Sequence, residues 1–265
     1  IKDFFRKNGF TKAVLGLSGG IDSALVAALA TEALGKENVL GILMPSHFST
    51  DHSVTDAVDL AKNLGIAYET LPIKEVYDAY INTLHPVFKD APFNVAEENL
   101  QARIRGGLVM AISNKFGHIL LNTSNKSEAS VGYGTLYGDL CGSLSVLGDV
   151  YKTDVYKLSR YINREREIIP ENTITKAPSA ELRPGQKDQD SLPDYDTLDA
   201  ILKLYLEENQ SQREIIGKGY APEVVEKTLR LVNRNEYKRA QCPPILKISK
   251  KAFGSGRRMP LTAKL

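Results

Sequence analysis

The chain has 265 residues, of which 42% are hydrophobic and 25% are charged, and its formal net charge is +2. This composition is typical of a globular protein, and the small net charge gives no general attraction to nucleic acid or to a membrane surface. Two cysteines are too few for a disulfide framework or a metal cluster, so we expect a reducing, cytoplasmic location. No apolar run approaches the ~20 residues of a membrane span.

Short apolar runs alternate with helical patterns as far as about residue 160. Strands are predicted over residues 12–17, 39–44, 67–71 and 118–122. Helices are predicted over residues 23–34, 53–64, 73–83 and 96–115, and the helical period of apolar side chains is seen in 53–64. Strands separated by helices imply right-handed crossovers. The sequence therefore predicts an α/β fold, a doubly wound parallel sheet flanked by helices.

The amino-acid composition of the sequence changes after about residue 170. Residues 170–195 are polar and contain four prolines, which predicts a long mobile loop. Residues 196–265 follow as a small helical C-terminal part that ends in the basic stretch "KKAFGSGRRMP". We expect the whole chain to form one α/β domain with this helical part appended.

The stretch "LSGGIDSAL" follows the first predicted strand directly. Its two glycines allow backbone amides to approach a ligand, and the start of the next helix favours an anion such as phosphate. The stretch fits neither GxxxxGK[ST] nor GxGxxG. Asp22 would repel a polyphosphate unless a divalent cation lay between them, so the residues indicate metal-bound pyrophosphate. The alternative is a tight turn in which Asp22 or Ser23 only caps the helix.

Several motifs together resemble a known family. "LSGGIDSAL" resembles the pyrophosphate loop of the N-type ATP pyrophosphatases, whose Rossmann-like fold is that of the adenine nucleotide alpha hydrolases. The stretches "ENLQARIRG", "LLNTSNKSEASVGYGTLYGD" and "GDVYKTDVYKLSRYIN" resemble the NAD+ synthetase family. The phrases "LMPSHFST", "NRNEYKRAQCPP" and "KAFGSGRRMP" narrow the resemblance to the synthetase domain of its glutamine-dependent members. The resemblance covers essentially the whole chain.

The resemblance implies a ligase activity. Deamido-NAD would be amidated to NAD through an adenylate, with ATP as co-substrate, Mg2+ as cofactor, ammonia as nitrogen donor, and AMP and pyrophosphate as products. In the full-length enzyme the ammonia comes from glutamine. The chain opens at "IKDFFRKNGF" without an initiator Met, so we expect an upstream glutaminase domain to precede it. The family also implies a homodimer or a larger homo-oligomer.

The resemblance assigns roles to individual residues. ATP contacts are expected at Gly16, Leu17, Ser18, Gly19, Gly20, Ile21, Asp22, Ser23, Thr123, Lys152 and Ser179. Deamido-NAD contacts are expected at Asn99, Arg105, Glu128 and Lys238. Asp22 and Glu128 would hold Mg2+, and these two residues with Lys152 form the expected catalytic set. Ammonia-only relatives have a lysine at the position of Leu136 and an aspartate at that of Ser143, and we expect Lys238 to take part of their role.

Plainer interpretations stay open at several of these positions. Glu128 could only cap a helix opened by Ser127, and Lys152 and Lys238 could be surface charges. Cys141 lies near the expected site, but no adjacent base supports a nucleophilic role. Among whole-protein alternatives, a GMP synthetase or a tRNA-thiolating enzyme would use the same loop. A nucleotide-sensing domain that kept the fold without the activity is the third alternative.

Overall fold

The computed structural model describes residues 1–254 and 256–261. Its sheet has five parallel strands in the order β3-β2-β1-β4-β5. The strands are β1 (Ala13–Gly16), β2 (Val39–Leu43), β3 (Ala67–Thr70), β4 (Ile119–Asn122) and β5 (Leu144–Ser145). The predicted doubly wound parallel sheet is confirmed. The sequence did not predict β5, because two residues are too few to show a periodic pattern.

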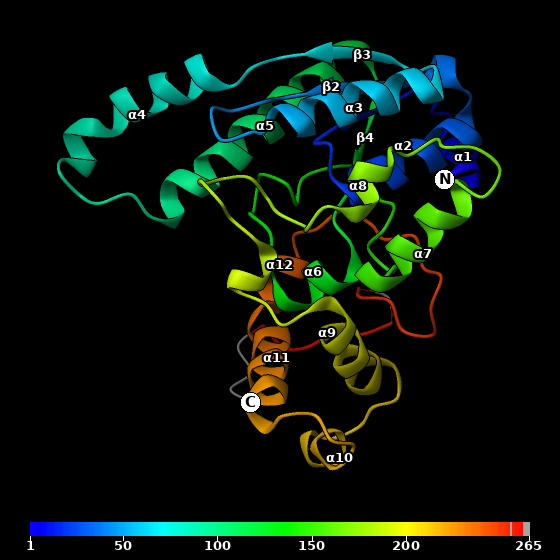
Figure 1. Cartoon of the computed structure of the whole chain (residues 1–265), viewed down its shortest axis with the longest axis vertical. Helices are drawn as coiled ribbons and strands as arrows, with labels where there is room; N and C mark the ends of the chain where they lie inside the picture. The colour runs from blue at the N-terminus through cyan, green and yellow to red at the C-terminus, as the bar shows by residue number, and fades with distance from the viewer. Residues whose placement is uncertain (255, 262–265) are drawn as a thin grey trace.

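Helices cover both faces of this sheet. The helices as far as residue 175 are α1 (Lys2–Asn8), α2 (Ile21–Leu34), α3 (Asp51–Leu64), α4 (Lys74–Phe88), α5 (Val95–Phe116), α6 (Lys126–Val131), α7 (Lys152–Ile162) and α8 (Glu171–Thr175), with a 3-10 turn at Lys36–Asn38. Helices α2, α3, α7 and α8 pack together on one face, and α5 packs on β1 and β4 from the other (Figure 1). Within the described ranges, no helix has both the length and the apolar character needed to cross a membrane.

The two faces of the sheet are packed by alternate residues of β1. Ala13 and Leu15 belong to the buried cluster that includes α2, whereas Val14 belongs to a second cluster with Val109 of α5. Successive side chains of a strand point to opposite faces, so a strand buried on both sides reads as a continuous apolar run. This explains why "AVLGL" could be recognised as a strand without any polar alternation.

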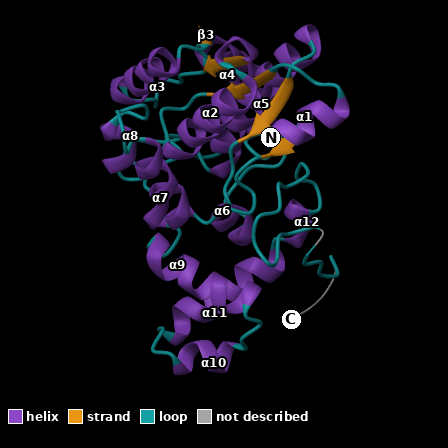
Figure 2. Ribbon diagram, turned by 90° about the vertical axis from the view of Figure 1, so that its right-hand side faces the viewer, coloured by secondary structure: helices purple, strands orange, loops and turns teal. Residues whose placement is uncertain are grey.

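The C-terminal part forms a smaller helical layer below the sheet in Figures 1 and 2. It consists of a 3-10 turn (Asp188–Asp190), α9 (Tyr195–Leu202), a π-helical turn (Lys203–Glu207), α10 (Gln212–Gly217), α11 (Pro222–Arg234) and α12 (Glu236–Arg239). Two further apolar clusters hold these helices together. The described residues after 239 form no further helix, so the helices end before the basic stretch near the C-terminus.

Residues 244–246 return to the edge of the sheet instead. The amide of Ser145 donates to the Pro244 carbonyl at 2.8 Å, and the amide of Leu246 donates to the Ser145 carbonyl at 3.2 Å. A short edge strand would otherwise leave these backbone groups unpaired, which is costly when they are buried. Residues 262–265 of the predicted helical part lie outside the described residues.

The segment 170–195 contains more regular secondary structure than the predicted loop. It contains α8 and the 3-10 turn, so the prediction of continuous loop is wrong there. Thr173 and Ile174 are buried, and Ile174 joins the same apolar cluster as α2, which explains the helical turn. The mobility of the remaining residues stays a prediction.

Candidate functional site

A cavity of about 540 Å3 lies beyond the carboxyl ends of β1 and β4. From β1 the chain adds β2 and β3 on one side of this strand, and then adds β4 and β5 on its other side. The order of the strands therefore reverses between β1 and β4. Such a switch point leaves a crevice in which open α/β sheets bind their ligands. Every residue assigned to ATP or deamido-NAD in the sequence, except Gly19, lines this cavity.

The loop between β1 and α2 is closed by its own serines. The hydroxyls of Ser18 and Ser23 lie 3.1 Å apart, and the amide of Gly20 donates to Ser18 Oγ at 3.2 Å. Gly20 is the N-cap residue of α2, and no side chain caps this helix. The interpretation of Asp22 or Ser23 as a simple helix cap is therefore wrong. The uncapped first amides of α2 remain available to an anion.

Gly19 has a different part in the loop. Its φ is 77°, a left-handed conformation, and a Cβ atom placed there would lie 2.2 Å from the Ser53 carbonyl oxygen. Only glycine satisfies both conditions without strain. Gly19 thus lets the loop pass against α3, and it shapes the cavity without lining it.

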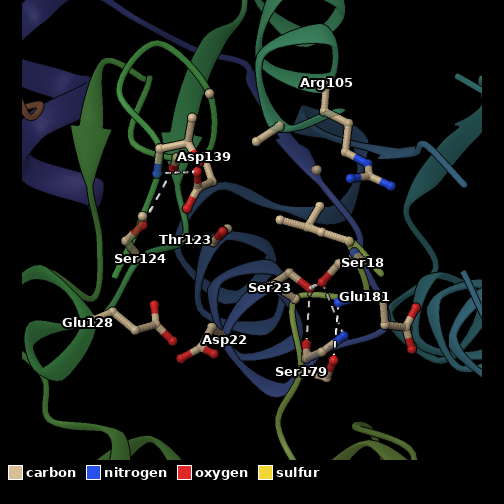
Figure 3. Close-up of a pocket in the computed structure, with 18 of the residues that line it drawn as sticks. Ser18, Asp22, Ser23, Arg105, Thr123, Ser124, Glu128, Asp139, Ser179 and Glu181 are labelled. Carbon is tan, nitrogen blue, oxygen red and sulfur yellow. Dashed lines mark hydrogen bonds between the residues drawn. The ribbon is translucent and has the colours of Figure 1, made fainter. Parts of the chain in front are cut away.

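Three charged side chains meet at one end of the cavity. Asp22 lies in the first turn of α2, Glu128 in the first turn of α6, and Lys152 begins α7. Lys152 Nζ contacts the carboxylate of Asp22 and lies 3.3 Å from Glu128 Oε1. Lys152 is 2% exposed, so its interpretation as a surface lysine is wrong. Figure 3 shows the two carboxylates beside each other at this end.

The charges of this cluster perturb one another. Burial raises the pKa of Glu128, and the positive charge of the neighbouring Lys152 opposes this shift. Burial alone would lower the pKa of Lys152, but the charges of Asp22 and Glu128 outweigh it and raise that pKa. Lys152 therefore stays cationic, and one ammonium group is shared by two carboxylates. Strongly perturbed pKa values in a cleft are typical of functional sites.

Asn125 organises this cluster, and the sequence analysis missed it. It is the N-cap residue of α6, with its side chain accepting from the Glu128 amide at 3.0 Å. Asn125 Nδ2 also donates to Asp22 Oδ1 at 2.9 Å. Glu128 closes the capping box, so it does take part in capping, but the helix is opened by Asn125 and not by Ser127. Glu128 Oε1 still faces Lys152.

The donor set of this cluster suits Mg2+. Asp22 and Glu128 offer carboxylate oxygens, which this ion prefers, and it commonly binds through one or two carboxylates together with substrate phosphates. Among the described residues, no group of three or more His, Cys, Asp or Glu side chains forms a ready-made metal site. The residues present thus fit a metal that is completed by phosphate oxygens.

Two further cations that line the cavity are bonded to backbone carbonyls. Arg105 Nε donates to the Met44 carbonyl at 2.9 Å, and burial lowers the pKa of Arg105 to about 10. Lys238 Nζ donates to the carbonyls of Gly132 and Gly134, each at 2.7 Å, so this lysine is not part of a solvated charge run. In Figure 3, Arg105 lies well away from the Asp22 and Glu128 carboxylates.

Of the other residues considered for dinucleotide binding, one lines the cavity and two do not. Asn99 lines the cavity and accepts a hydrogen bond from Thr135 Oγ1 at 2.6 Å. Leu136 and Ser143 do not line it. Their contacts are through the backbone: the Leu136 carbonyl accepts from Arg103 Nε at 3.2 Å, and the Ser143 amide donates to the Leu120 carbonyl.

The segment 176–188 forms one wall of the cavity and adds residues that the sequence analysis did not single out. Ser179 lies in this wall, and its hydroxyl accepts from the Glu181 amide at 3.1 Å. The Glu181 carboxylate accepts from Ser53 Oγ at 2.7 Å, and Lys176 Nζ lies 3.1 Å from Asp56 Oδ2. These contacts tie the wall to the first turns of α3. No local sequence pattern could have predicted pairs that lie more than 100 residues apart.

Cys141 also lines the cavity. Burial, with a further contribution from the charge of Asp139, raises the pKa of its thiol to about 11. A thiol with so high a pKa is a poor nucleophile at neutral pH. This agrees with the expectation that Cys141 has no nucleophilic role.

Comparison with known proteins identifies the family. The model of the NAD synthase family matches residues 1–242. The chain belongs to this family. Among curated relatives, the glutamine-dependent NAD(+) synthetase of Synechocystis sp. is 60% identical over 261 residues, which are 98% of this chain and 47% of the relative. The chain thus spans about half the length of the curated relatives it matches.

Solved structures agree with this placement. The glutamine-dependent NAD+ synthetase of Acinetobacter baumannii in complex with ADP is 46% identical with a TM-score of 0.66, over 98% of this chain and 47% of that one. The NH3-dependent NAD synthetase of Campylobacter jejuni is 32% identical with a TM-score of 0.72, over 93% of both chains. Both the fold and the family predicted from the sequence are confirmed.

Proposed function

We propose that this chain catalyses the ATP- and Mg2+-dependent amidation of deamido-NAD to NAD, releasing AMP and pyrophosphate. One observation carries the proposal: a single cavity joins an uncapped phosphate loop and an Asp–Lys–Glu cluster to an arginine-lined end in a member of the NAD synthase family. Each end suits one substrate, so the two reacting groups would meet between them.

ATP would bind at the loop end. The free amides at the start of α2 and the positive end of its dipole would hold the phosphates, with the hydroxyls of Ser18 and Ser23 beside them. Thr123 and Ser179 line the same region and would complete the nucleotide contacts. Lys152 would place its charge next to the pyrophosphate as that group leaves.

Mg2+, held by Asp22 and Glu128 together with phosphate oxygens, would neutralise phosphate charge during the displacement. The metal would also relieve the repulsion between these two carboxylates and the polyphosphate. Lys152, which contacts Asp22 and Glu128, would add its own positive charge beside the phosphates.

Deamido-NAD would bind at the arginine end. Arg105 uses Nε to contact Met44, and its two terminal nitrogens form no hydrogen bond to any described residue. They are therefore free to pair with an acidic group of the dinucleotide. Asn99 and Lys238 would supply further polar contacts, and Glu128 would face the nicotinate group from the other side.

The reaction would proceed in two steps. A carboxylate oxygen of the nicotinate attacks the α-phosphorus of ATP, so the bond to pyrophosphate breaks and an acyl adenylate forms. Ammonia then attacks the acyl carbon and loses a proton, and AMP leaves with the electron pair of the broken C–O bond. The enzyme's task is alignment and charge neutralisation, which needs no covalent enzyme intermediate. The wall at 176–188 would limit the access of water to the adenylate.

The nitrogen source is ammonia in this proposal. The glutamine-dependent relatives are about twice as long as this chain, and we propose that an upstream glutaminase domain supplies ammonia in the full-length protein. A cytoplasmic location and a homo-oligomeric state are part of the same proposal. Neither cysteine shows the features of a glutaminase nucleophile, since burial raises the thiol pKa of both.

A product assay tests the proposal. The chain is incubated with ATP, Mg2+, deamido-NAD and ammonium, and NAD, AMP and pyrophosphate are quantified. We expect the three products in equal amounts, and no NAD when glutamine is the only nitrogen source. Parallel incubations replace deamido-NAD with xanthosine monophosphate, the acceptor of a GMP synthetase. Amidation of that acceptor alone, or release of ADP and phosphate, would overturn the proposal.

A further inference from the structure

The first turn of α6 connects the cavity to distant parts of the chain through successive side chains. Asn125 donates to Asp22, and Glu128 pairs with Lys152. Between them, Lys126 and Ser127 point away from the cavity toward the C-terminal part. Both Lys126 and Ser127 are fully buried. This turn is therefore one place where the helical C-terminal part can influence the charged cluster.

Asp199 is the partner of Ser127 and lies on α9. Its carboxylate accepts from the Ser127 hydroxyl in a short hydrogen bond, and its other oxygen accepts from the Thr153 amide at 2.8 Å. The Ser127 hydroxyl in turn accepts from the Lys152 amide at 2.9 Å. One carboxylate thus connects the beginning of α6 with the beginning of α7. These are the two helices that carry Glu128 and Lys152.

These contacts replace a local cap of α7. The N-cap residue of α7 is Tyr151, and its side chain makes no capping hydrogen bond. The first two amides of the helix, those of Lys152 and Thr153, are instead satisfied by Ser127 and Asp199. Free amides at a helix start need partners, and a negative charge there is favourable. The position at which α7 begins is thereby fixed from outside the helix.

Asp199 is buried in an environment that disfavours its charged carboxylate form. It is 1% exposed, and burial raises its pKa despite the hydrogen bonds it accepts. A buried charge is tolerated only when its partners compensate for lost water. Its partners here are Ser127 and Thr153, next to Glu128 and Lys152 in the sequence, and it does not line the cavity.

We propose that Asp199 is a positioning residue for adenylation: it fixes the starts of α6 and α7 so that Lys152 faces both Asp22 and Glu128. The inference rests on the proposed function, because it assigns Lys152 to the departing pyrophosphate. Asp199 acts through Ser127 and the α7 amides and touches no substrate. The C-terminal helical part therefore contributes to the alignment of the site as well as to stability.

An Asp199→Asn variant tests this role with little change in size. The amide can accept only one of the two hydrogen bonds, because its nitrogen must face either the Ser127 hydroxyl or the Thr153 amide. Ser127→Ala removes the connection from the other side and serves as a second variant. Ile201→Ala is the matched control, since Ile201 lies on the same helix and packs only in the α9–α11 cluster.

Turnover is measured per active site, with sites counted from the pyrophosphate burst in the absence of ammonia. We expect Asp199→Asn and Ser127→Ala to lower kcat per site by roughly 10- to 100-fold, the range typical of a lost supporting hydrogen bond, while KM for deamido-NAD changes less than about twofold. Ile201→Ala should lower the thermal midpoint and leave kcat per site unchanged.

The outcomes separate this inference from the proposed function. Fewer active sites with wild-type kcat per site in both Asp199→Asn and Ser127→Ala would show a purely structural role and overturn the inference alone. A similar kcat loss in Ile201→Ala would overturn it as well, because alignment would then depend on general packing. A wild-type chain that forms no NAD from deamido-NAD would overturn the proposed function and the inference with it.

Discussion

The two ends of the cavity hold their charges in opposite ways. At the loop end, Lys152 is paired with two carboxylates and is almost fully buried. At the far end, Arg105 donates to the Met44 backbone carbonyl and forms no ion pair with any described residue. The charge of Lys152 is neutralised by carboxylates and becomes available to a ligand only when other groups bind those carboxylates. The charge of Arg105 is not neutralised by a neutral carbonyl and is available to a ligand from the start. We therefore expect Lys152 to act in the reaction and Arg105 to act in substrate binding.

The largest effect is expected at the paired end, from Lys152→Met. This change removes the cation and leaves Asp22 and Glu128 facing each other without compensation. We expect adenylate formation to slow by about 10³-fold, the upper range for loss of one electrostatic group in an active site. Pyrophosphate release without ammonia isolates that step.

Lys157→Met is the control for this variant, because Lys157 lies on the same helix but is exposed and pairs only with Asp154. It should release pyrophosphate at the wild-type rate. An unchanged rate of pyrophosphate release in Lys152→Met would show that Lys152 has no role in adenylate formation. The proposed difference in function between the two ends of the cavity would then be contradicted.

Asp22→Asn should have the next largest effect. The amide keeps the size of the side chain but lacks the negative charge that would bind Mg2+. We expect a loss of roughly 100-fold in kcat at saturating Mg2+. The thermal midpoint should also fall, because the buried Lys152 loses one of its two ion-pair partners. Asp51→Asn is the control, since Asp51 also lies in a first helical turn but does not line the cavity. Near-normal turnover in Asp22→Asn would contradict the metal role.

Arg105→Gln tests the binding end and should change a different kinetic constant. Loss of the free guanidinium nitrogens should raise KM for deamido-NAD about 10-fold and change kcat less than about threefold, as expected when an interaction is lost equally in ground and transition states. Arg103→Gln, two residues earlier on α5, is the control, because Arg103 does not line the cavity. A loss in kcat at unchanged KM would place Arg105 in the chemistry instead.

The smallest effect is expected at Cys141. Burial and the nearby Asp139 raise the pKa of this thiol to about 11, so its thiolate fraction at pH 8 is about 100-fold below that of a free cysteine. We expect Cys141→Ser to retain NAD formation within about twofold, and alkylation of Cys141 in the native chain to be correspondingly slow. Alkylation in urea supplies the reference rate. Rapid native alkylation that abolishes activity would contradict both the pKa and the absence of a nucleophilic role.

Local patterns were sufficient for most of the fold and for the glycine-rich loop before α2, whereas Glu128 and Lys152 were assigned from the family resemblance. The buried run before Gly16 and the helical period over residues 53–64 predicted β1 and α3 closely. The two residues of β5 and the helical turn of α8 were not predictable, because long-range packing and pairing form them. The same limit applies to Glu181 and Asp199 and to the contact of Asn125 with Asp22, because these partners lie far away in the sequence. The capping role of Asn125 is local, since Glu128 follows it by three residues.

The proposed reaction requires that deamido-NAD is activated as an acyl adenylate in this cavity. Deamido-NAD labelled with oxygen-18 in both carboxylate oxygens tests it directly, because the attacking oxygen stays on the phosphorus when AMP leaves. With ATP, Mg2+ and ammonium, we expect one labelled oxygen in each AMP and the other in the amide carbonyl of NAD. Label that appears in pyrophosphate or inorganic phosphate, with none in AMP, would contradict the claim.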